Sequence, residues 1–395
     1  MTEIKVYVVG TGMDGVKTLT LEAFTIIDSA DVLIGAGRML EPFEHLQKKM
    51  ICEYSAEKIA DYIHNCGHNT IVVLMSGDCG FYSGAKRLSE FLDCEIVSGI
   101  STPVYFCSKI GRQWENMKFV SLHGKHGNVA VNVMQNEHCF FLLGGKITPA
   151  EICGTLCRYG LGAVSVFVGE NLCYENERII SGTAESLQDI ESGNLCAVIT
   201  ENKNYMKYIP SGIDDGDFIR TAIPMTKAEV RAVAVSKLNI GRNSICWDIG
   251  CGTGSVSVEM AVKCTDGGVY AFDKNLKAVK LTSENSEKFG CDNIHVYESL
   301  FPEDIPENIP VPNCVFIGGA SGKISGIIKY VTKLNPSVEI VVTAVSVETL
   351  NECMNVFDTE ITQIAVTRTR RIGSHTMLSA ENPVFVIKRK IKCVE

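Results

Sequence analysis

The sequence predicts an α/β protein with two successive units, each built from short strands that alternate with helices. Apolar strand-like segments recur along all 395 residues, with helical stretches between them. Two of these strands run directly into glycine-rich turns, one at Gly10 and one at Gly250. Alternation of strands and helices favours parallel sheets with right-handed crossovers. A chain of this length can form two or three domains, each with its own core.

The first unit is expected over 1–205. Its strands are predicted at 4–9, 32–35, 71–75, 95–97, 118–121, 139–143, 164–168 and 195–199, with helices such as 84–92 and 149–159 between them. Segment 206–221 is rich in Gly and Asp and contains Pro, a composition typical of a linker.

The second unit is expected over 222–395. Its strands are predicted at 244–249, 268–272, 293–297, 313–317, 338–343, 360–366 and 383–388. Helices alternate with the first five strands, which indicates a doubly wound parallel sheet. The last two strands have no helix between them, so we expect them to form an antiparallel hairpin at the sheet edge.

Composition excludes several classes of function. The formal charge is −9 and no basic tract is present, which argues against a nucleic-acid partner. No apolar run reaches the roughly 18 residues of a membrane span, and no basic leader precedes the first strand, so we expect a cytoplasmic protein. The 17 cysteines contain no C-x-x-C pair, so we expect buried thiols and no metal site.

The run W-D-I-G-C-G-T-G-S at 247–255 is the most specific motif of the chain. Glycines at alternate positions let the backbone turn sharply and expose N–H groups to a ligand. Asp273 ends the next predicted strand, where a carboxylate can bind ribose hydroxyls. This combination predicts an S-adenosylmethionine (SAM) site made by Gly250, Cys251, Gly252, Thr253, Gly254 and Asp273.

Two further segments are expected near this turn. Thr226 precedes a predicted helix at 228–238, and two roles stay open for its hydroxyl: a helix N-cap or a contact to the cofactor carboxylate. Gly318 and Gly319 follow the fourth strand, whose carboxyl end flanks the same crevice. The segment from Gly318 to Lys323 is one residue too short for a P-loop and has Ile324 in place of Ser or Thr, so ATP binding is excluded there.

Arg368, Arg370 and Arg371 form a basic cluster near the C-terminus. Two interpretations stay open: a solvent-facing hairpin, or a rim that binds substrate carboxylates, since Arg offers bidentate contacts.

The second unit resembles the precorrin-6B C15-methyltransferase (decarboxylating) family of cobalamin biosynthesis. The resemblance covers 222–388 and includes A-I-P-M-T-K-A-E-V-R-A-V, the glycine turn, V-F-I-G-G-A-S-G and N-P-V-F-V-I. It implies a Rossmann-like class I SAM methyltransferase fold. The glycine turn alone would also fit tRNA adenine methyltransferases.

Three strand ends of the first unit carry small residues that can line one cleft. The candidate cofactor-binding residues there are Gly10, Gly12, Asp78, Gly80, Ser101 and Thr102. The motifs A-D-V-L-I-G-A-G-R-M-L, S-G-D-C-G-F-Y-S-G-A-K-R-L and W-E-N-M-K-F-V-S-L-H-G-K resemble the precorrin C5-methyltransferase branch of the tetrapyrrole methylase superfamily. The resemblance implies a fold of two lobes with SAM in the cleft between them.

Two residues of these motifs, Cys79 and His123, affect what the first site is expected to do. Cys79 stands where that family usually has Pro, which predicts a less rigid turn. His123 has three open roles: proton transfer, substrate contact or a structural role between the lobes.

Both resemblances together imply a bifunctional enzyme with two SAM sites. It would methylate a tetrapyrrole at C5 and C15 and remove the C12 acetate carboxyl. They also suggest a homo-oligomer. The alternatives are a SAM-dependent RNA methyltransferase and a SAM-binding module without catalysis.

Overall fold

The structure is a computed structural model that describes residues 4–123, 127–319 and 323–390. The predicted α/β class is confirmed. One compact unit comprises Met1–Lys125, His138–Glu151 and Ser165–Glu201, and the other comprises His126–Glu137, Ile152–Val164 and Asn202–Glu395. In the described part of the chain, no helix is both long enough and apolar enough to cross a membrane.

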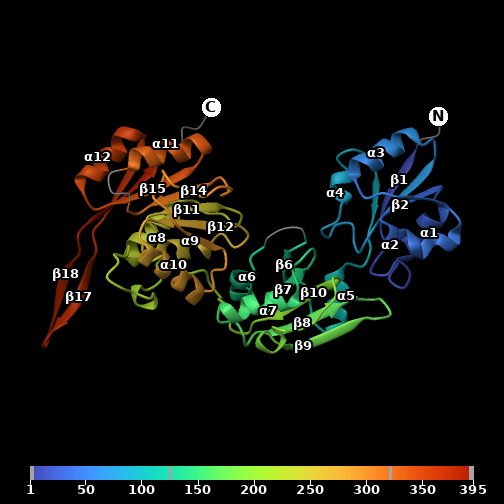
Figure 1. Ribbon diagram of the computed structural model, residues 1–395, viewed down its shortest axis with the longest axis horizontal. Coiled ribbons are helices and arrows are strands. Elements are labelled where there is room, and N and C mark those ends of the chain that lie inside the picture. The colour runs from blue at the N-terminus through green and yellow to red at the C-terminus, as the bar shows by residue number, and fades with distance from the viewer. Residues whose placement is uncertain (1–3, 124–126, 320–322, 391–395) are drawn as a thin grey trace. The chain divides into compact units, whose positions relative to one another are not determined.

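The first unit begins with a five-stranded parallel sheet in the order β3-β2-β4-β1-β5 (Figure 1). Its elements are β1 (Lys5–Gly10), α1 (Leu21–Ser29), β2 (Val32–Gly35), α2 (Gly37–Leu40), the 3-10 helix η1 (Glu41–Leu46), β3 (Lys49–Cys52), α3 (Ala56–Asn65), β4 (Thr70–Met75), α4 (Ala85–Leu88) and β5 (Glu95–Val97). Buried apolar residues on β1, β2 and β4 pack on both faces of this sheet.

A second five-stranded sheet follows in the order β6-β7-β10-β8-β9, in which only β6 and β7 run parallel. The elements from here to the end of this sheet are α5 (Thr102–Ile110), β6 (Lys118–Ser121), α6 (Ala130–Gln135), β7 (His138–Leu142), α7 (Pro149–Arg158), β8 (Ser165–Glu170), β9 (Arg178–Thr183), η2 (Glu185–Leu187) and β10 (Cys196–Glu201). Two small α/β lobes are therefore present, as the resemblance implied.

Three details of the first unit differ from expectation. Strands β3 and β9 were not predicted, because both are edge strands whose residues are mostly half-buried or exposed and show no strict apolar alternation. Helix α4 is confined to Ala85–Leu88 instead of 84–92, and the chain continues through turns toward β5.

The second unit contains a seven-stranded sheet in the order β13-β12-β11-β14-β15-β19-β16 (Figure 1). The first five strands in this order are parallel, and β19 runs antiparallel to both β15 and β16, so the predicted antiparallel pair of the last two sheet strands is confirmed. The expected alternation with helices fails once, because no helix lies between β13 and β14. The elements are η3 (Asp215–Asp217), α8 (Ala228–Lys237), β11 (Ile245–Ile249), α9 (Ser255–Ala261), β12 (Gly268–Asp273), α10 (Leu276–Lys288), β13 (Ile294–Glu298), β14 (Cys314–Ile317), α11 (Ile324–Leu334), β15 (Glu339–Ala344), α12 (Val347–Val356), β16 (Thr359–Ile364), β17 (Thr367–Ile372), β18 (His375–Ala380) and β19 (Val384–Arg389).

A separate hairpin is inserted between the two antiparallel edge strands. Strands β17 and β18 pair only with each other, and all their residues are exposed except half-buried Arg368. Figure 1 shows this hairpin extending away from the seven-stranded sheet. The sequence predicted an edge hairpin but not this insertion.

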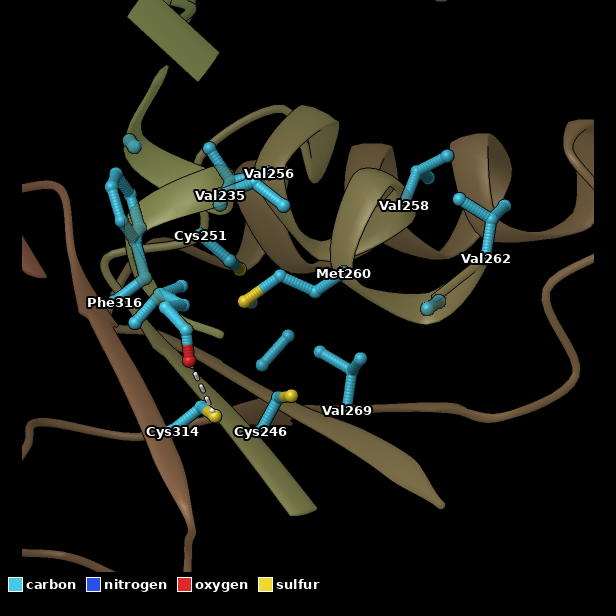
Figure 2. Packing of buried hydrophobic residues seen from close by; sticks show 14 of the residues in the cluster. Val235, Cys246, Cys251, Val256, Val258, Met260, Val262, Val269, Cys314 and Phe316 are labelled. Atoms are coloured by element: carbon cyan, nitrogen blue, oxygen red, sulfur yellow. Dashed lines mark hydrogen bonds between the residues drawn. The ribbon is translucent and has the colours of Figure 1, made fainter. Parts of the chain in front are cut away.

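Several cysteines belong to the apolar core between α8, α9 and the sheet. Figure 2 shows Met260 of α9 facing Cys246 and Val269 on the strands below. Cys314 donates a hydrogen bond from its Sγ to the Leu238 carbonyl at 3.2 Å. All cysteines in the described residues are free thiols, and those of this core behave as small apolar side chains.

The segment expected to be a linker packs firmly on the second unit. Ile213 and Phe218 are buried there, and the Glu259 carboxylate accepts hydrogen bonds from the backbone N–H groups of Gly212 and Ile213 at 3.0 Å. Helix α6 also belongs to this unit. At the start of α6, the backbone N–H groups of Val129, Ala130 and Val131 donate hydrogen bonds to the Asp292 carboxylate.

Candidate active sites

The turn between β11 and α9 has a backbone conformation that favours glycine. Gly250, Gly252 and Gly254 have φ values of 81°, 56° and 74°, in the left-handed region that side chains disfavour. A Cβ atom on Gly250 would lie 3.0 Å from the backbone nitrogen of Gly319. The turn therefore brings the ends of β11 and β14 into close backbone approach.

Asp273 is tied directly to this turn. Its Oδ2 accepts a hydrogen bond from the Gly252 N–H at 3.0 Å, and its Oδ1 accepts one from the Asn275 N–H at 2.9 Å. A carboxylate has about four lone-pair sites, so both oxygens can still accept hydrogen bonds from ligand hydroxyls.

Two cavities share the glycine turn as a wall. The first, of about 470 Å³, is named here the Asp273 cavity and also contains Lys274, Asn275, Ser299, Leu300 and Phe301 in its lining. The second, of about 390 Å³, is named the Asp248 cavity and is also lined by Lys227, Phe316, Thr343, Glu381, Asn382 and Val384.

The structure brings the predicted cofactor residues of this unit together. Gly250, Gly252, Asp273, Gly318 and Gly319 line the Asp273 cavity, and Thr226, Gly250, Cys251, Gly252, Thr253 and Gly318 line the Asp248 cavity. Gly254 lines neither cavity and instead occupies the N-cap position of α9. Ala320, Ser321 and Gly322, which complete the second glycine motif, lie outside the described residues.

The expected capping role of Thr226 is wrong. Lys227 occupies the N-cap position of α8, and no side chain caps that helix. The helix begins one residue later than a Thr226 cap would require. Thr226 instead lines the Asp248 cavity, in agreement with the other role left open for it.

Asp248 is the main site residue that the sequence did not identify. It is fully buried in β11 and lines the Asp248 cavity. Its Oδ2 accepts a hydrogen bond from Ser257 Oγ, while its Oδ1 is buried without a hydrogen-bond partner in the described residues. Burial, with a smaller effect of the nearby Asp273 charge, raises the pKa of Asp248 to about 7. An acidic residue inside an otherwise apolar strand was the available signal.

A buried arginine holds the segment before α8 in place. The Arg231 guanidinium donates hydrogen bonds to Glu259 at 2.9 Å and to Asp215 at 2.8 Å. It also donates to the backbone carbonyl of Thr226, so it fixes the residue that enters the cavity.

The three arginines of the C-terminal cluster have different environments. Arg368 forms ion pairs with Glu229 of α8 and with Glu381, which lines the Asp248 cavity. Arg370 and Arg371 are exposed on β17. Only Arg368 is therefore connected to the wall of a cavity described above.

The three strand ends of the first unit meet one another through their glycines. A Cβ atom on Gly10 would lie 2.7 Å from the carbonyl oxygen of Gly77 and 2.8 Å from the nitrogen of Gly99. Gly12 and Gly77 exchange two backbone hydrogen bonds, at 3.1 and 2.7 Å. We expected these glycines to let a ligand approach the backbone closely. In the structure, they let neighbouring backbone segments approach one another.

Asp78 connects these strand ends. Its carboxylate accepts hydrogen bonds from the N–H groups of Gly80 at 2.8 Å and Gly99 at 3.0 Å. Ser101 occupies the N-cap position of α5 without a side-chain cap hydrogen bond, and Thr102 begins that helix. All the predicted cofactor residues of this unit therefore lie on segments that meet at the carboxyl ends of β1 and β4 or follow β5.

Cys79 is a core residue. Its side chain is buried, and its Sγ donates hydrogen bonds toward the carbonyls of Val8 at 3.4 Å and Val97 at 3.5 Å. The thiol therefore connects the turn to β1 and β5.

His123 lines a third cavity, of about 610 Å³, which is named here the Arg38 cavity. Its other walls include the ends of β2 and β4, the segment 53–57, the segment 82–84 before α4, and the last two residues of α4. None of the predicted cofactor residues lines it. The His123 ring also fills the space beside Gly144, where a Cβ atom would overlap with it. Gly124 and Lys125 of the same motif lie outside the described residues.

Comparisons with known proteins give two matches that divide the chain. Residues 218–390 match the family described as precorrin methyltransferase domain. Residues 5–188 match the family described as tetrapyrrole (corrin/porphyrin) methylases.

Curated relatives match about half of the chain. The "Probable cobalt-precorrin-6B C(15)-methyltransferase (decarboxylating)" of Pyrobaculum calidifontis is 40% identical over 188 residues, 46% of this chain and 96% of that protein. The protein of the same name from Saccharolobus solfataricus is 37% identical over 190 residues, 46% of this chain and 96% of that protein. A solved precorrin-6y C5,15-methyltransferase from Geobacter metallireducens is 32% identical, with a TM-score of 0.44, and the match covers 47% of this chain and 100% of that one.

Proposed function

This chain belongs to the precorrin methyltransferase family, and we propose that it is a bifunctional SAM-dependent enzyme of cobalamin biosynthesis. Residues 222–395 methylate C15 of a corrin-ring precursor and remove the carboxyl group of its C12 acetate. Residues 1–205 methylate C5, and 206–221 connect the two domains.

The relation between Asp273, the glycine turn and the two cavities is the observation that supports this proposal. SAM has a ribose with two hydroxyls and an amino-acid part with a positively charged amino group. Asp273 offers acceptors for the hydroxyls in one cavity, and the unpartnered Oδ1 of Asp248 offers an acceptor for the amino group in the other. The residues present therefore fit SAM.

Holding and orienting the reactants is the main task of these residues. SAM, when bound, supplies an activated methyl group, so the protein needs no nucleophile of its own. Thr226, fixed through Arg231, and the glycine turn hold the cofactor against β11. Apolar wall residues such as Phe316 and Val384 exclude water from the Asp248 cavity, where the acceptor carbon is held.

The first unit carries the second SAM site of this proposal. We assign its SAM site to the segments that carry Gly10, Gly12, Asp78, Gly80, Ser101 and Thr102, which meet at or beside the strand ends. The acceptor is a tetrapyrrole in both reactions. Nucleic acids are not substrates, and the chain forms homo-oligomers in the cytoplasm.

The full chain is tested with SAM and precorrin-6B or cobalt-precorrin-6B. Mass spectrometry should show a gain of two methyl groups and loss of CO2. Asp273→Ala should abolish C15 methylation and preserve C5 methylation of supplied precorrin-7. Methylation of tRNA, or no transfer to any acceptor despite SAM binding, would contradict the proposal.

A further inference from the structure

The Arg38 cavity lies at the carboxyl edge of the first parallel sheet. Gly35 at the end of β2 and Met75 at the end of β4 both line it. Ligands of parallel α/β sheets bind at this edge. With a volume of about 610 Å³, it is larger than the two cavities of the second unit.

The acidic residues of this cavity already have cationic partners other than Arg38: Lys58 lies 3.8 Å from Glu53, and Arg87 pairs with Glu57. Glu53 accepts hydrogen bonds from the backbone N–H groups of Tyr54 and Ser55, both at 2.9 Å. Glu57 accepts a hydrogen bond from Ser55 Oγ at 2.9 Å and forms an ion pair with Arg87. These contacts satisfy the two carboxylates without help from Arg38.

Arg38 therefore remains as the uncompensated cation of the cavity. No hydrogen bond or ion pair to its side chain occurs within 4–123, 127–319 and 323–390. A guanidinium presents five N–H donors in a planar fork that matches a carboxylate. Because Arg38 is exposed on the wall of the cavity, its guanidinium is available to an anionic group of a ligand.

The walls beside Arg38 suit a flat apolar ring system. Met39, Leu74 and Met75 supply apolar surface. Tyr82 lines the cavity with an exposed side chain and a φ of 49°, a left-handed conformation that is costly for an aromatic residue. Such conformations are found at ligand sites more often than elsewhere.

We propose that the Arg38 cavity binds the tetrapyrrole acceptor of the C5 reaction and that Arg38 forms a bidentate contact with one of its peripheral carboxylates. This inference rests on the function proposed for the first unit and identifies where its acceptor is recognised. SAM also has a carboxylate, but none of the six residues assigned to SAM in this unit lines this cavity.

The test compares Arg38→Ala and Arg38→Lys in the full chain, with Lys86→Ala as the control. Lys86 is an exposed cation on α4 that does not line the cavity. Lys86→Ala therefore changes the net charge by the same amount as Arg38→Ala but leaves the cavity intact. The acceptor is precorrin-7, and KM, kcat and the Kd of SAM are measured. Loss of a charge-assisted bidentate contact should raise KM for precorrin-7 about tenfold or more in Arg38→Ala. The Kd of SAM, the melting temperature and the C15 reaction should not change.

Arg38→Lys should give an intermediate KM, because it retains charge but lacks the fork. An unchanged KM in Arg38→Ala, or a weaker Kd of SAM instead, would overturn the assignment. Equilibrium binding of precorrin-7 to the same variants separates the two proposals. Binding that depends on Arg38 in a chain that does not methylate C5 would contradict the proposed function and not this inference.

Discussion

Arg231 and Glu259 form an ion pair in which neither side chain is exposed, with Nε 2.9 Å from Oε1. Glu259 also accepts hydrogen bonds from the backbone of Gly212 and Ile213, and Arg231 donates to the carbonyl of Thr226. One buried pair thus connects α8 and α9 to the segment that precedes the cofactor site. The pair therefore holds two helices of the second unit together and also fixes the position of Thr226 beside the cofactor site.

Replacing Arg231 by Met should strongly destabilise the second unit. Removing one partner leaves a buried carboxylate without its counter-charge, which costs about 3–5 kcal/mol. The unfolding transition of the second unit in urea should shift to lower concentration. Arg158→Ala is the matched control, because Arg158 pairs with Glu287 on the surface and such pairs contribute about 1 kcal/mol or less. Equal effects of the two substitutions would contradict this account.

Asp248 should make the stability of the second unit depend on pH. Its raised pKa of about 7 means that the folded chain binds the proton more tightly than the unfolded chain, whose value is near 3.8. The stabilising effect of this proton is therefore complete below about pH 4 and is lost as the pH rises toward 7. The loss is on the order of 4 kcal/mol.

Asp248→Asn keeps the side chain neutral and should remove most of this dependence. Urea midpoints measured from pH 5 to pH 8 test it, with Asp358→Asn, at an exposed carboxylate of the same unit, as the control. If the wild type and Asp248→Asn lose stability equally over that range, Asp248 is not the titrating group.

The sequence predicted the elements whose residues repeat a burial pattern and missed those without one. Strands β11, β12, β14 and β15 are mostly buried and each is followed by a helix, so their parallel order followed from general rules. The β17–β18 hairpin is exposed almost throughout, so no apolar alternation marks it, and only its backbone ladder defines it.

The site residues also fall into two groups, those that the sequence predicted and those that it missed. The glycine turn and Asp273 are close in sequence and were predicted as one site. The partnership of Arg231 with Glu259 depends on the packing of two helices. The position of the buried Asp248 at the wall of a cavity depends on strand order. Neither could be predicted from local sequence.

Arg368 should act on the C15 reaction through Glu381 rather than through the substrate. Arg368→Ala leaves the Glu381 carboxylate uncompensated on the wall of the Asp248 cavity, where it repels a substrate rich in carboxylates. The KM for precorrin-6B should rise about tenfold. Glu381→Gln in the same chain should restore it, because it removes the repelling charge. If Glu381→Gln does not restore KM, and Arg370→Ala and Arg371→Ala raise KM as much as Arg368→Ala does, the hypothesis of a carboxylate-binding rim is favoured instead.

Gly250→Ala should abolish C15 methylation and leave C5 methylation intact. The new Cβ would require a φ of 81° and would lie 3.0 Å from the Gly319 nitrogen, so the turn must move and the two cavities it separates must change shape. Gly326→Ala is the matched control: among the described residues, no atom outside α11 lies within 4 Å of a Cβ atom at this position, and alanine favours a helix by up to about 1 kcal/mol. The control should therefore keep both activities and unfold at the same or a higher temperature. A Gly250→Ala variant that still transfers the C15 methyl group at the wild-type rate would show that the turn does not shape this site.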